Sequence, residues 1–213
     1  MLLGILKSSI RLSVLLSLLL VASGFSEPVP FWRGNKKLET KLEEERAILV
    51  SVRSSDVPAG VRFSFRGVGL VKRERRDVLK LAMRFDDLKT VSDHFKEVKW
   101  EPKTNRLFVV GQALGYQARM LLQIEKVEGV TPTRDEIRFK VIDGHFLGLE
   151  GALVLETRTP ASKASGERTE MSIWCLQEAK ELPLPRALVG FALEVIAQRV
   201  AGKMREHLEA KPL

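Results

Sequence analysis

Histidine is the side chain best suited to acid–base chemistry near neutral pH, and the sequence holds three of them: His94, His145 and His207. Asp93 directly precedes His94 in a helical pattern, so the two side chains point in different directions and cannot act as a paired acid and base. His145 lies in a glycine-rich, strand-like segment, where one ring nitrogen could hydrogen-bond a polar ligand head group. We therefore treat His145 as a candidate binding residue, with a structural role as its alternative.

Other reactive side chains lack the partners that catalysis needs. The sequence has no G-x-S-x-G elbow, no His-rich or Cys-rich metal spacing, and no Lys-Ser/Thr ending after the glycines of "GHFLGLEG". Tyr116, the only tyrosine, could donate a hydrogen bond inside a cavity or simply pack at a strand end. Cys175 can form no internal disulfide and is predicted to be a small buried hydrophobe. The sequence thus predicts no catalytic residue, no metal site and no cofactor.

The first 26 residues have the layout of a secretory signal. Lys7 and Arg11 precede the apolar run "LSVLLSLLLVASGF", which ends in small residues. We expect residues 1–26 to be a signal peptide, cleaved near Ser23 to Ser26, and the protein to be exported to a periplasm. An uncleaved membrane anchor is the alternative, although the apolar run is shorter than the ~20 residues that span a bilayer.

The protein stays basic without this segment. Residues 1–26 hold Lys7, Arg11 and no acid, so their removal lowers the net charge from +8 to +6. A basic exported protein could contact anionic lipid head groups, and "KRERR" at 72–76 is either such a contact or a solvated junction. Nucleic acid is excluded as a partner because no zinc finger, recognition helix or aromatic RNA-binding motif occurs.

Most of the chain follows the period of β-strands. Residues 61–71 alternate Val61, Phe63 and Phe65 with polar side chains, which is typical of a strand with one wet face. Turn signals such as "PKTN" and "PASKASGE" separate short strands, which indicates an antiparallel meander. The predicted strands are 47–52, 61–71, 106–111, 118–127, 136–143, 151–159 and 168–177, after a charged lead-in or tether at 27–46.

Two stretches follow the helical period instead. Apolar residues recur at spacings of three and four over 76–95, which predicts a helix or a broken helix pair. The second stretch begins near Pro185, and its stripe is formed by Leu188, Ala192, Ile196, Val200, Met204 and Leu208, widened by Phe191 and Val195. Because charges gather in its second half, we expect this C-terminal helix to be deeply buried at its start and wetter at its end.

This order of elements resembles the START-like (SRPBCC) superfamily, which includes polyketide cyclases and lipid-transfer domains. The likeness covers residues 47–210, with "DVLKLAMRFDDL" matching the helix that commonly follows a valine-containing strand end, and Arg84 standing where an acid is common. The resemblance implies an α+β helix-grip fold over 47–213: a curved antiparallel sheet wrapped around the long C-terminal helix, with an apolar cavity between them. Gly144, Gly148 and Gly151 would then permit bends or close backbone approach in the sheet.

The resemblance also implies where a ligand would lie. We expect a monomeric carrier of a lipid or isoprenoid-like molecule; a cyclase-type or hydrolase-type enzyme, or an interaction domain whose cavity is filled by its own side chains, are the alternatives. The shortage of buried-looking His, Tyr and Asp favours binding over catalysis. The candidate ligand-binding residues are Phe63, Phe65, Phe108, Tyr116, Phe139, Val141, His145, Leu153, Leu155, Phe191 and Val195.

Overall fold

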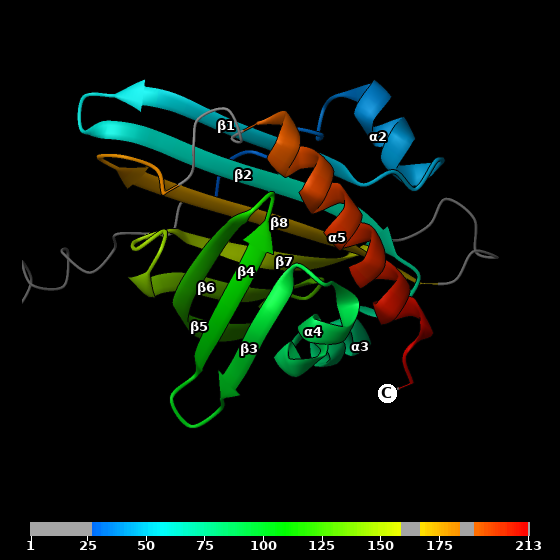
Figure 1. Cartoon of the computed structure of the whole chain (residues 1–213). Helices are drawn as coiled ribbons and strands as arrows, with labels where there is room; N and C mark the ends of the chain where they lie inside the picture. The colour runs from blue at the N-terminus through cyan, green and yellow to red at the C-terminus, as the bar shows by residue number, and fades with distance from the viewer. Residues whose placement is uncertain (1–26, 159–166, 184–189, 213) are drawn as a thin grey trace, which may run out of the picture.

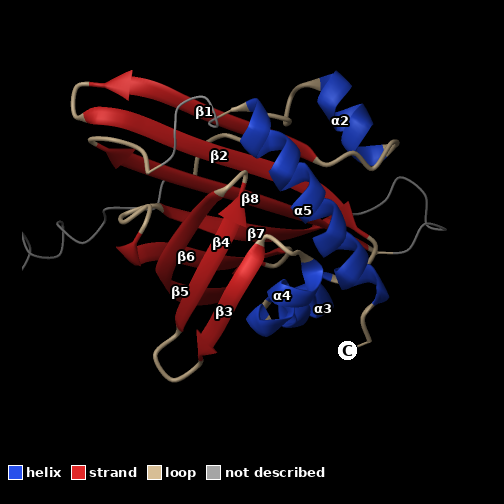
Figure 2. Cartoon of the chain, in the orientation of Figure 1, coloured by secondary structure: helices blue, strands red, loops and turns tan. Residues whose placement is uncertain are grey.

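An eight-stranded antiparallel sheet curves around one long helix in the computed structural model, which describes residues 27–158, 167–183 and 190–212 (Figures 1 and 2). The strand order is β1-β2-β8-β7-β6-β5-β4-β3. The first hairpin, β1 and β2, therefore joins the meander of β3 to β8 through the pairing of β2 with the last strand, β8. The predicted helix-grip α+β fold is confirmed. The predicted signal peptide, the strand end at residue 159 and the helix start near Pro185 lie outside the described residues.

The strands and helices have the following bounds. The strands are β1 (Leu49–Val57), β2 (Gly60–Val71), β3 (Phe95–Glu101), β4 (Arg106–Ala113), β5 (Tyr116–Thr131), β6 (Arg134–Gly144), β7 (Glu150–Arg158) and β8 (Arg168–Ala179). The helices are α2 (Lys36–Glu43), α3 (Arg75–Ala82), the 3-10 turn η1 (Phe85–Asp87), α4 (Leu88–Val91) and α5 (Phe191–Ala210).

The prediction missed one strand. Residues 76–95 form α3, η1 and α4 as a broken helical segment, but the edge strand β3 follows at once and begins at Phe95. In this strand Val98 is buried and Trp100 packs on the core, while Lys96 and Lys99 are exposed. Charged residues are typical of an edge strand because they discourage pairing with other chains, and here they also hide the strand period.

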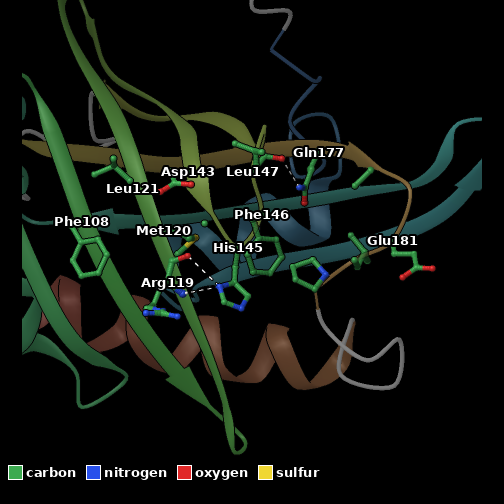
Figure 3. Close-up of a pocket in the computed structure, with 14 residues that line it drawn as sticks. Phe108, Arg119, Met120, Leu121, Asp143, His145, Phe146, Leu147, Gln177 and Glu181 are labelled. Atoms are coloured by element: carbon green, nitrogen blue, oxygen red, sulfur yellow. Dashed lines mark hydrogen bonds between the residues drawn. The ribbon is translucent and has the colours of Figure 1, made fainter.

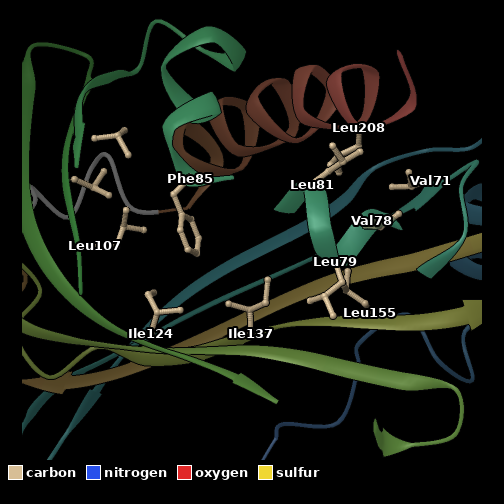
Figure 4. Packing of buried hydrophobic residues seen from close by; sticks show 12 residues of the cluster. Val71, Val78, Leu79, Leu81, Phe85, Leu107, Ile124, Ile137, Leu155 and Leu208 are labelled. Atoms are coloured by element: carbon tan, nitrogen blue, oxygen red, sulfur yellow. The ribbon is translucent and has the colours of Figure 1, made fainter. Parts of the chain in front are cut away.

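The main core lies between the sheet and the second half of α5. Figure 4 shows α3 and η1 inserting apolar side chains between α5 and the strands of the curved sheet. This core contains Val71, Val78, Leu79, Leu81, Phe85, Val98, Leu107, Val109, Ile124, Ile137, Leu155 and Leu208.

The lead-in at 27–46 packs on the outer face of the sheet. Val68 and Leu70 of β2 face outward, where Trp32 and Leu42 cover them and are almost fully buried themselves. Within this segment Asn35 caps α2 by accepting a hydrogen bond from the Leu38 amide at 3.3 Å. The α2 region thus forms a third layer over one end of the sheet.

The burial of α5 is the reverse of what we predicted from its sequence. Phe191 is 81% exposed and Val195 39% exposed, whereas Leu208 near the other end is 1% exposed. Among the described residues of α5, Leu208 alone is fully buried. The charged second half of α5 packs on α3 and the main core, whereas the apolar first half lines an open groove.

Candidate functional site

An apolar groove of about 360 Å³ lies between the first half of α5 and the inner face of the sheet. Aliphatic side chains of α5 form one wall, and aromatic and small side chains of the strands form the rest. We call it the apolar groove; it is lined by Phe63, Phe65, His94, Phe95, Gly111, Gln112, Ala113, Leu114, Tyr116, Ala118, Met120, Phe146, Leu149, Cys175, Leu193, Ile196, Ala197 and Val200. Its volume falls within the usual range for small-molecule sites.

Glycines shape the sheet at this groove. A Cβ on Gly151 would lie 2.1 Å from the Trp174 carbonyl oxygen and 2.8 Å from the Cα of Cys175, so β7 can pass this close to β8 only with glycine. Gly144 has φ +90°, and a Cβ there would lie 2.3 Å from the Arg119 carbonyl oxygen. The expected close backbone approach is confirmed at these two positions, whereas at Gly148, with φ +85°, no described atom outside its chain neighbours lies within 4 Å of where a Cβ would stand.

Cys175 faces the apolar groove from β8. Burial raises the pKa of its thiol to about 12, against a weaker lowering effect of a hydrogen bond with the Phe65 backbone. The side chain is therefore a neutral thiol at physiological pH. It packs as a partly buried small hydrophobe, in agreement with the predicted role.

His94 also touches the groove but is already engaged. Its Nδ1 lies 2.9 Å from the Gln112 carbonyl oxygen, and the Gln112 amide donates to the His94 carbonyl oxygen at 2.8 Å. These contacts tie the start of β3 to the end of β4. The ring therefore has a structural contact with the backbone.

A second, more polar pocket of about 830 Å³ adjoins the groove at the end of β8 (Figure 3). Met120 and Phe146 line both spaces, so the two lie side by side with these side chains in their common wall. We call it the polar mouth; it is lined by Phe108, Arg119, Met120, Leu121, Asp143, Gly144, His145, Phe146, Leu147, Gln177, Ala179, Glu181, Leu182 and Pro183.

His145 stands in the polar mouth beside the β5 backbone (Figure 3). Its own amide donates to the Arg119 carbonyl oxygen at 2.7 Å, and the Arg119 amide lies 3.2 Å from its Nδ1. The ring nitrogen is also 3.3 Å from that carbonyl oxygen, which already has a donor. Because an amide can only donate, Nδ1 is best unprotonated in the neutral ring, and Nε2 carries the proton.

Gln177 is the most deeply buried polar side chain of the mouth, at 4% exposed. Its Nε2 donates to the Leu147 carbonyl oxygen at 3.0 Å, which ties β8 to the β6–β7 turn. Its Oε1 is buried and has no hydrogen-bond partner among the described residues. Gln177 is not among the predicted binding residues, although alternation along "MSIWCLQ" places it on the same face as Cys175.

Outside α5, the structure separates the predicted binding residues into four groups. Phe63, Phe65 and Tyr116 line the apolar groove, whereas Phe108 and His145 line the polar mouth. Leu153 lies beside a small pocket of about 60 Å³ under α5. Buried or half-buried packing, away from both spaces, is found for Phe139, Val141 and Leu155.

Three orientations differ from those we predicted. Leu107 and Val109 of β4 belong to the main core, so Phe108 between them faces the opposite side of the sheet. On α5 the residues that face the groove are Leu193, Ile196, Ala197 and Val200, and not Phe191 or Val195. The sequence stripe was thus assigned about one residue out of phase at the start of the helix.

The basic run at 72–76 is largely a structural junction. The Arg73 guanidinium donates to the carbonyl oxygens of Glu209 and Lys211 at 3.1 and 2.8 Å. These backbone acceptors at the end of α5, which lack partners within the helix, are thereby hydrogen-bonded. Arg75 forms an ion pair with Asp135. Two of its arginines are therefore occupied within the fold.

Neither metal ligation nor membrane spanning is indicated by the described residues. Within the ranges 27–158, 167–183 and 190–212, no group of three or more His, Cys, Asp or Glu side chains could hold a metal ion. In the same ranges, no helix is long and apolar enough to cross a membrane.

Comparison with known proteins supports the fold through structure alone. No family model and no curated protein sequence matches the chain. It is similar to the STAR-related lipid transfer protein from Xanthomonas axonopodis, with a TM-score of 0.55 and 13% identity over 76% of this chain and 93% of that one. It is also similar to a protein from Thermus thermophilus, with a TM-score of 0.49 and 17% identity over 68% of this chain and 96% of that one. The likeness to the lipid transfer protein concerns the fold and agrees with the helix-grip architecture described above.

Proposed function

We propose that this chain, a START-like helix-grip protein, is a non-enzymatic carrier or sensor of a hydrophobic molecule such as a lipid or isoprenoid. The observation that carries the proposal is the apolar groove under the first half of α5, a half of the helix that does not fill the space beneath it. A domain whose core is filled by its own side chains would bury this half of α5, as it buries Leu208.

The groove supplies affinity through the hydrophobic effect. Apolar surface removed from water contributes roughly 25 cal/mol for each Å². Groove-lining side chains such as Phe65, Met120 and Ile196 offer apolar contact from both sides of a narrow space. A hydrophobic chain lying between them would lose its contact with water, and part of that gain is offset by the ordering of the bound molecule.

Binding is favoured over catalysis by the state of the groove's reactive groups. His94 makes a backbone contact through Nδ1, and Cys175 is a protonated thiol. A cyclase-type reaction would need a placed acid and base that face the same bound substrate. Among the described residues the groove offers no such pair.

We also propose that the protein is exported. The basis is the order of positive, apolar and small residues over 1–26. Mass spectrometry of the protein from its native envelope should find a new N-terminus near Ser23 to Ser26. An intact Met1 in a cytosolic fraction would overturn this localisation.

A groove-filling variant tests the proposed function. Ala197 faces the groove, whereas the next residue, Gln198, is exposed on the same helix. Ala197→Phe should fill the space, and Gln198→Phe adds the same ring to the outside. The measurement is native mass spectrometry with lipid extraction on protein purified from its own envelope.

The expected result is a co-purifying lipid-sized mass in the parent and in Gln198→Phe, and its loss in Ala197→Phe. Circular dichroism should show that both variants fold. A parent protein that is always empty and accepts no added lipid or quinone would refute the carrier and favour an interaction domain.

A further inference from the structure

The polar mouth contains an acceptor that the fold itself leaves unused. Gln177 Oε1 is buried and unpartnered among the described residues, in a side chain that is only 4% exposed. A buried acceptor without a partner costs free energy, so the fold would normally avoid one. The Gln177 side chain belongs to the lining of the polar mouth, so this unused acceptor lies in the wall of a space that can admit a molecule.

The amide orientation is fixed by its other end. The Leu147 carbonyl oxygen can only accept, and Gln177 Nε2 lies 3.0 Å from it. Rotating the amide by half a turn would set two oxygens against each other. The free atom is therefore the oxygen, and it calls for a hydrogen-bond donor.

The position of Gln177 links this acceptor to the apolar groove. Cys175 lies in the groove, and Gln177 is two residues further along the same face of β8, which is about 7 Å in a strand. Phe146 and Met120 stand between the two spaces and line both. A molecule that passes these two side chains can thus have its apolar chain in the groove and its head group beside Gln177.

Charge in the mouth selects among head groups. Asp143 and Glu181 are two acids against one base, Arg119, so the lining carries a net negative charge. A carboxylate or phosphate has no proton to donate to Gln177 Oε1 and would meet this negative lining. A hydroxyl can donate to Oε1, and its own oxygen can accept in turn.

We propose that the molecule in the groove carries an uncharged hydroxyl head group, which donates a hydrogen bond to Gln177 Oε1. This inference rests on the proposed function, because it assigns the head-group end of the same bound molecule. Gln177 acts in it as the specificity-determining residue. Satisfying a buried acceptor should favour the alcohol over an equally apolar ligand without a donor by roughly 10-fold in affinity.

Chain-matched probes test the assignment by isothermal titration calorimetry. Decanol has the donor, decyl methyl ether lacks it, and decanoate has an anionic head. The parent protein should bind decanol roughly 10-fold tighter than the ether, with decanoate weaker than decanol. In Gln177→Leu, decanol should lose this advantage and bind about as tightly as the ether binds the same variant.

Gln123→Leu is the matched control. Gln123 of β5 donates to the carbonyl oxygens of Thr104 and Asn105 and lines neither the groove nor the mouth. This variant should keep the parent's preference for decanol. A thermal melt of each variant shows whether it folds. If Gln177→Leu does not fold, the parent's ranking of the three probes still tests the hydroxyl assignment.

The outcomes separate the two proposals. Equal binding of decanol and the ether by the parent would overturn the hydroxyl assignment and leave the carrier function standing. Tightest binding of decanoate would overturn it in favour of an anionic head group. Failure of all three probes to bind would instead count against the carrier function itself.

Discussion

The two halves of α5 meet the same sheet in opposite ways. At the C-terminal end, Leu208 is buried in the main core and Glu209 accepts a hydrogen bond from the Lys72 amide at 2.8 Å. At the N-terminal end, Phe191 is exposed, and Glu194 accepts from the Val52 amide of the edge strand at 2.8 Å. Beneath this second end lies the apolar groove.

The difference shows how one helix can serve stability and binding separately. The closed end contributes packing and satisfied polar groups, which hold the helix on the sheet. The open end keeps apolar side chains at a space that packing does not fill. Sites that must admit a ligand are drawn from the less stable parts of a fold.

The largest expected effect concerns Cys175 on the floor of the open end. Because burial raises the pKa of its thiol from 9.0 to about 12, the thiolate fraction at pH 8 should be on the order of 1000-fold lower in the folded protein than in the unfolded chain. The measurement is the rate of reaction with an uncharged thiol reagent, with and without denaturant. Equal rates would mean that water enters the groove freely.

This shift also predicts a loss of stability at high pH. The folded protein holds the Cys175 proton more tightly than the unfolded chain, so its contribution is complete below pH 9 and falls as the pH rises toward 12. Cys175→Ser should weaken this dependence. A denaturant titration at several alkaline pH values would measure it.

The next largest difference should appear in the loss of stability when an aliphatic side chain is truncated at either end of α5. Leu208→Ala removes a fully buried side chain and should cost about 2–4 kcal/mol of unfolding free energy. Ile196→Ala, at the groove, should cost below about 1.5 kcal/mol because the side chain is only half-buried. Urea titration of both variants checks this, and equal costs would erase the distinction between the ends.

The two glutamates provide a smaller, matched pair. Glu209→Ala removes an acceptor used by the Lys72 amide and by Arg46, and should cost about 1–3 kcal/mol. Glu194→Ala should cost less, about 0.5–1.5 kcal/mol, and should speed ligand exchange because it frees the start of α5. Thermal melts and stopped-flow displacement measure the two effects. Slower ligand exchange in Glu194→Ala would contradict this view of the open end.

The smallest expected effect is an acid sensitivity at the closed end. Burial alone would raise the pKa of Asp87, but hydrogen bonds from Lys211 at 2.5 Å and His207 at 3.4 Å outweigh it and lower that pKa. The Asp87 carboxylate therefore stabilises the fold above its ordinary pKa near 3.8, and this contribution is lost as the pH falls below that value. Asp87→Asn should lower stability at pH 7 by under about 1 kcal/mol and flatten the loss below pH 4. Unchanged acid unfolding would show that the contact contributes nothing.

Much of the fold could be predicted because its strands have one apolar face. Alternation in β2 placed Phe63 inward correctly, and the glycines at 144 and 151 marked real constraints. β3 escaped prediction because its alternation is weak among charged residues. In α5, the sequence pattern identified an apolar helix but could not reveal that its apolar half would remain over an open space.

The site was only partly predictable for a related reason. Phe146 enters both pockets from a turn at φ +60°, a conformation that its residue type does not suggest. Gln177 could have been predicted as a site residue from the sequence, since a polar residue on the apolar face of a strand needs a hydrogen-bond partner. The alternation of β4 was assigned to the wrong face at Phe108, because Leu107 and Val109 are equally apolar.

Protection of Cys175 by a bound molecule tests the central claim most directly. It is the single cysteine of the chain and lies on the floor of the apolar groove, so its modification reports on that space alone. Mass spectrometry can follow its reaction with a small uncharged thiol reagent, with and without saturating decanol. If a hydrophobic molecule occupies the groove, decanol should slow the reaction at least about 10-fold. A reaction rate that decanol leaves unchanged, although calorimetry shows it to be bound, would place the ligand elsewhere and contradict the account.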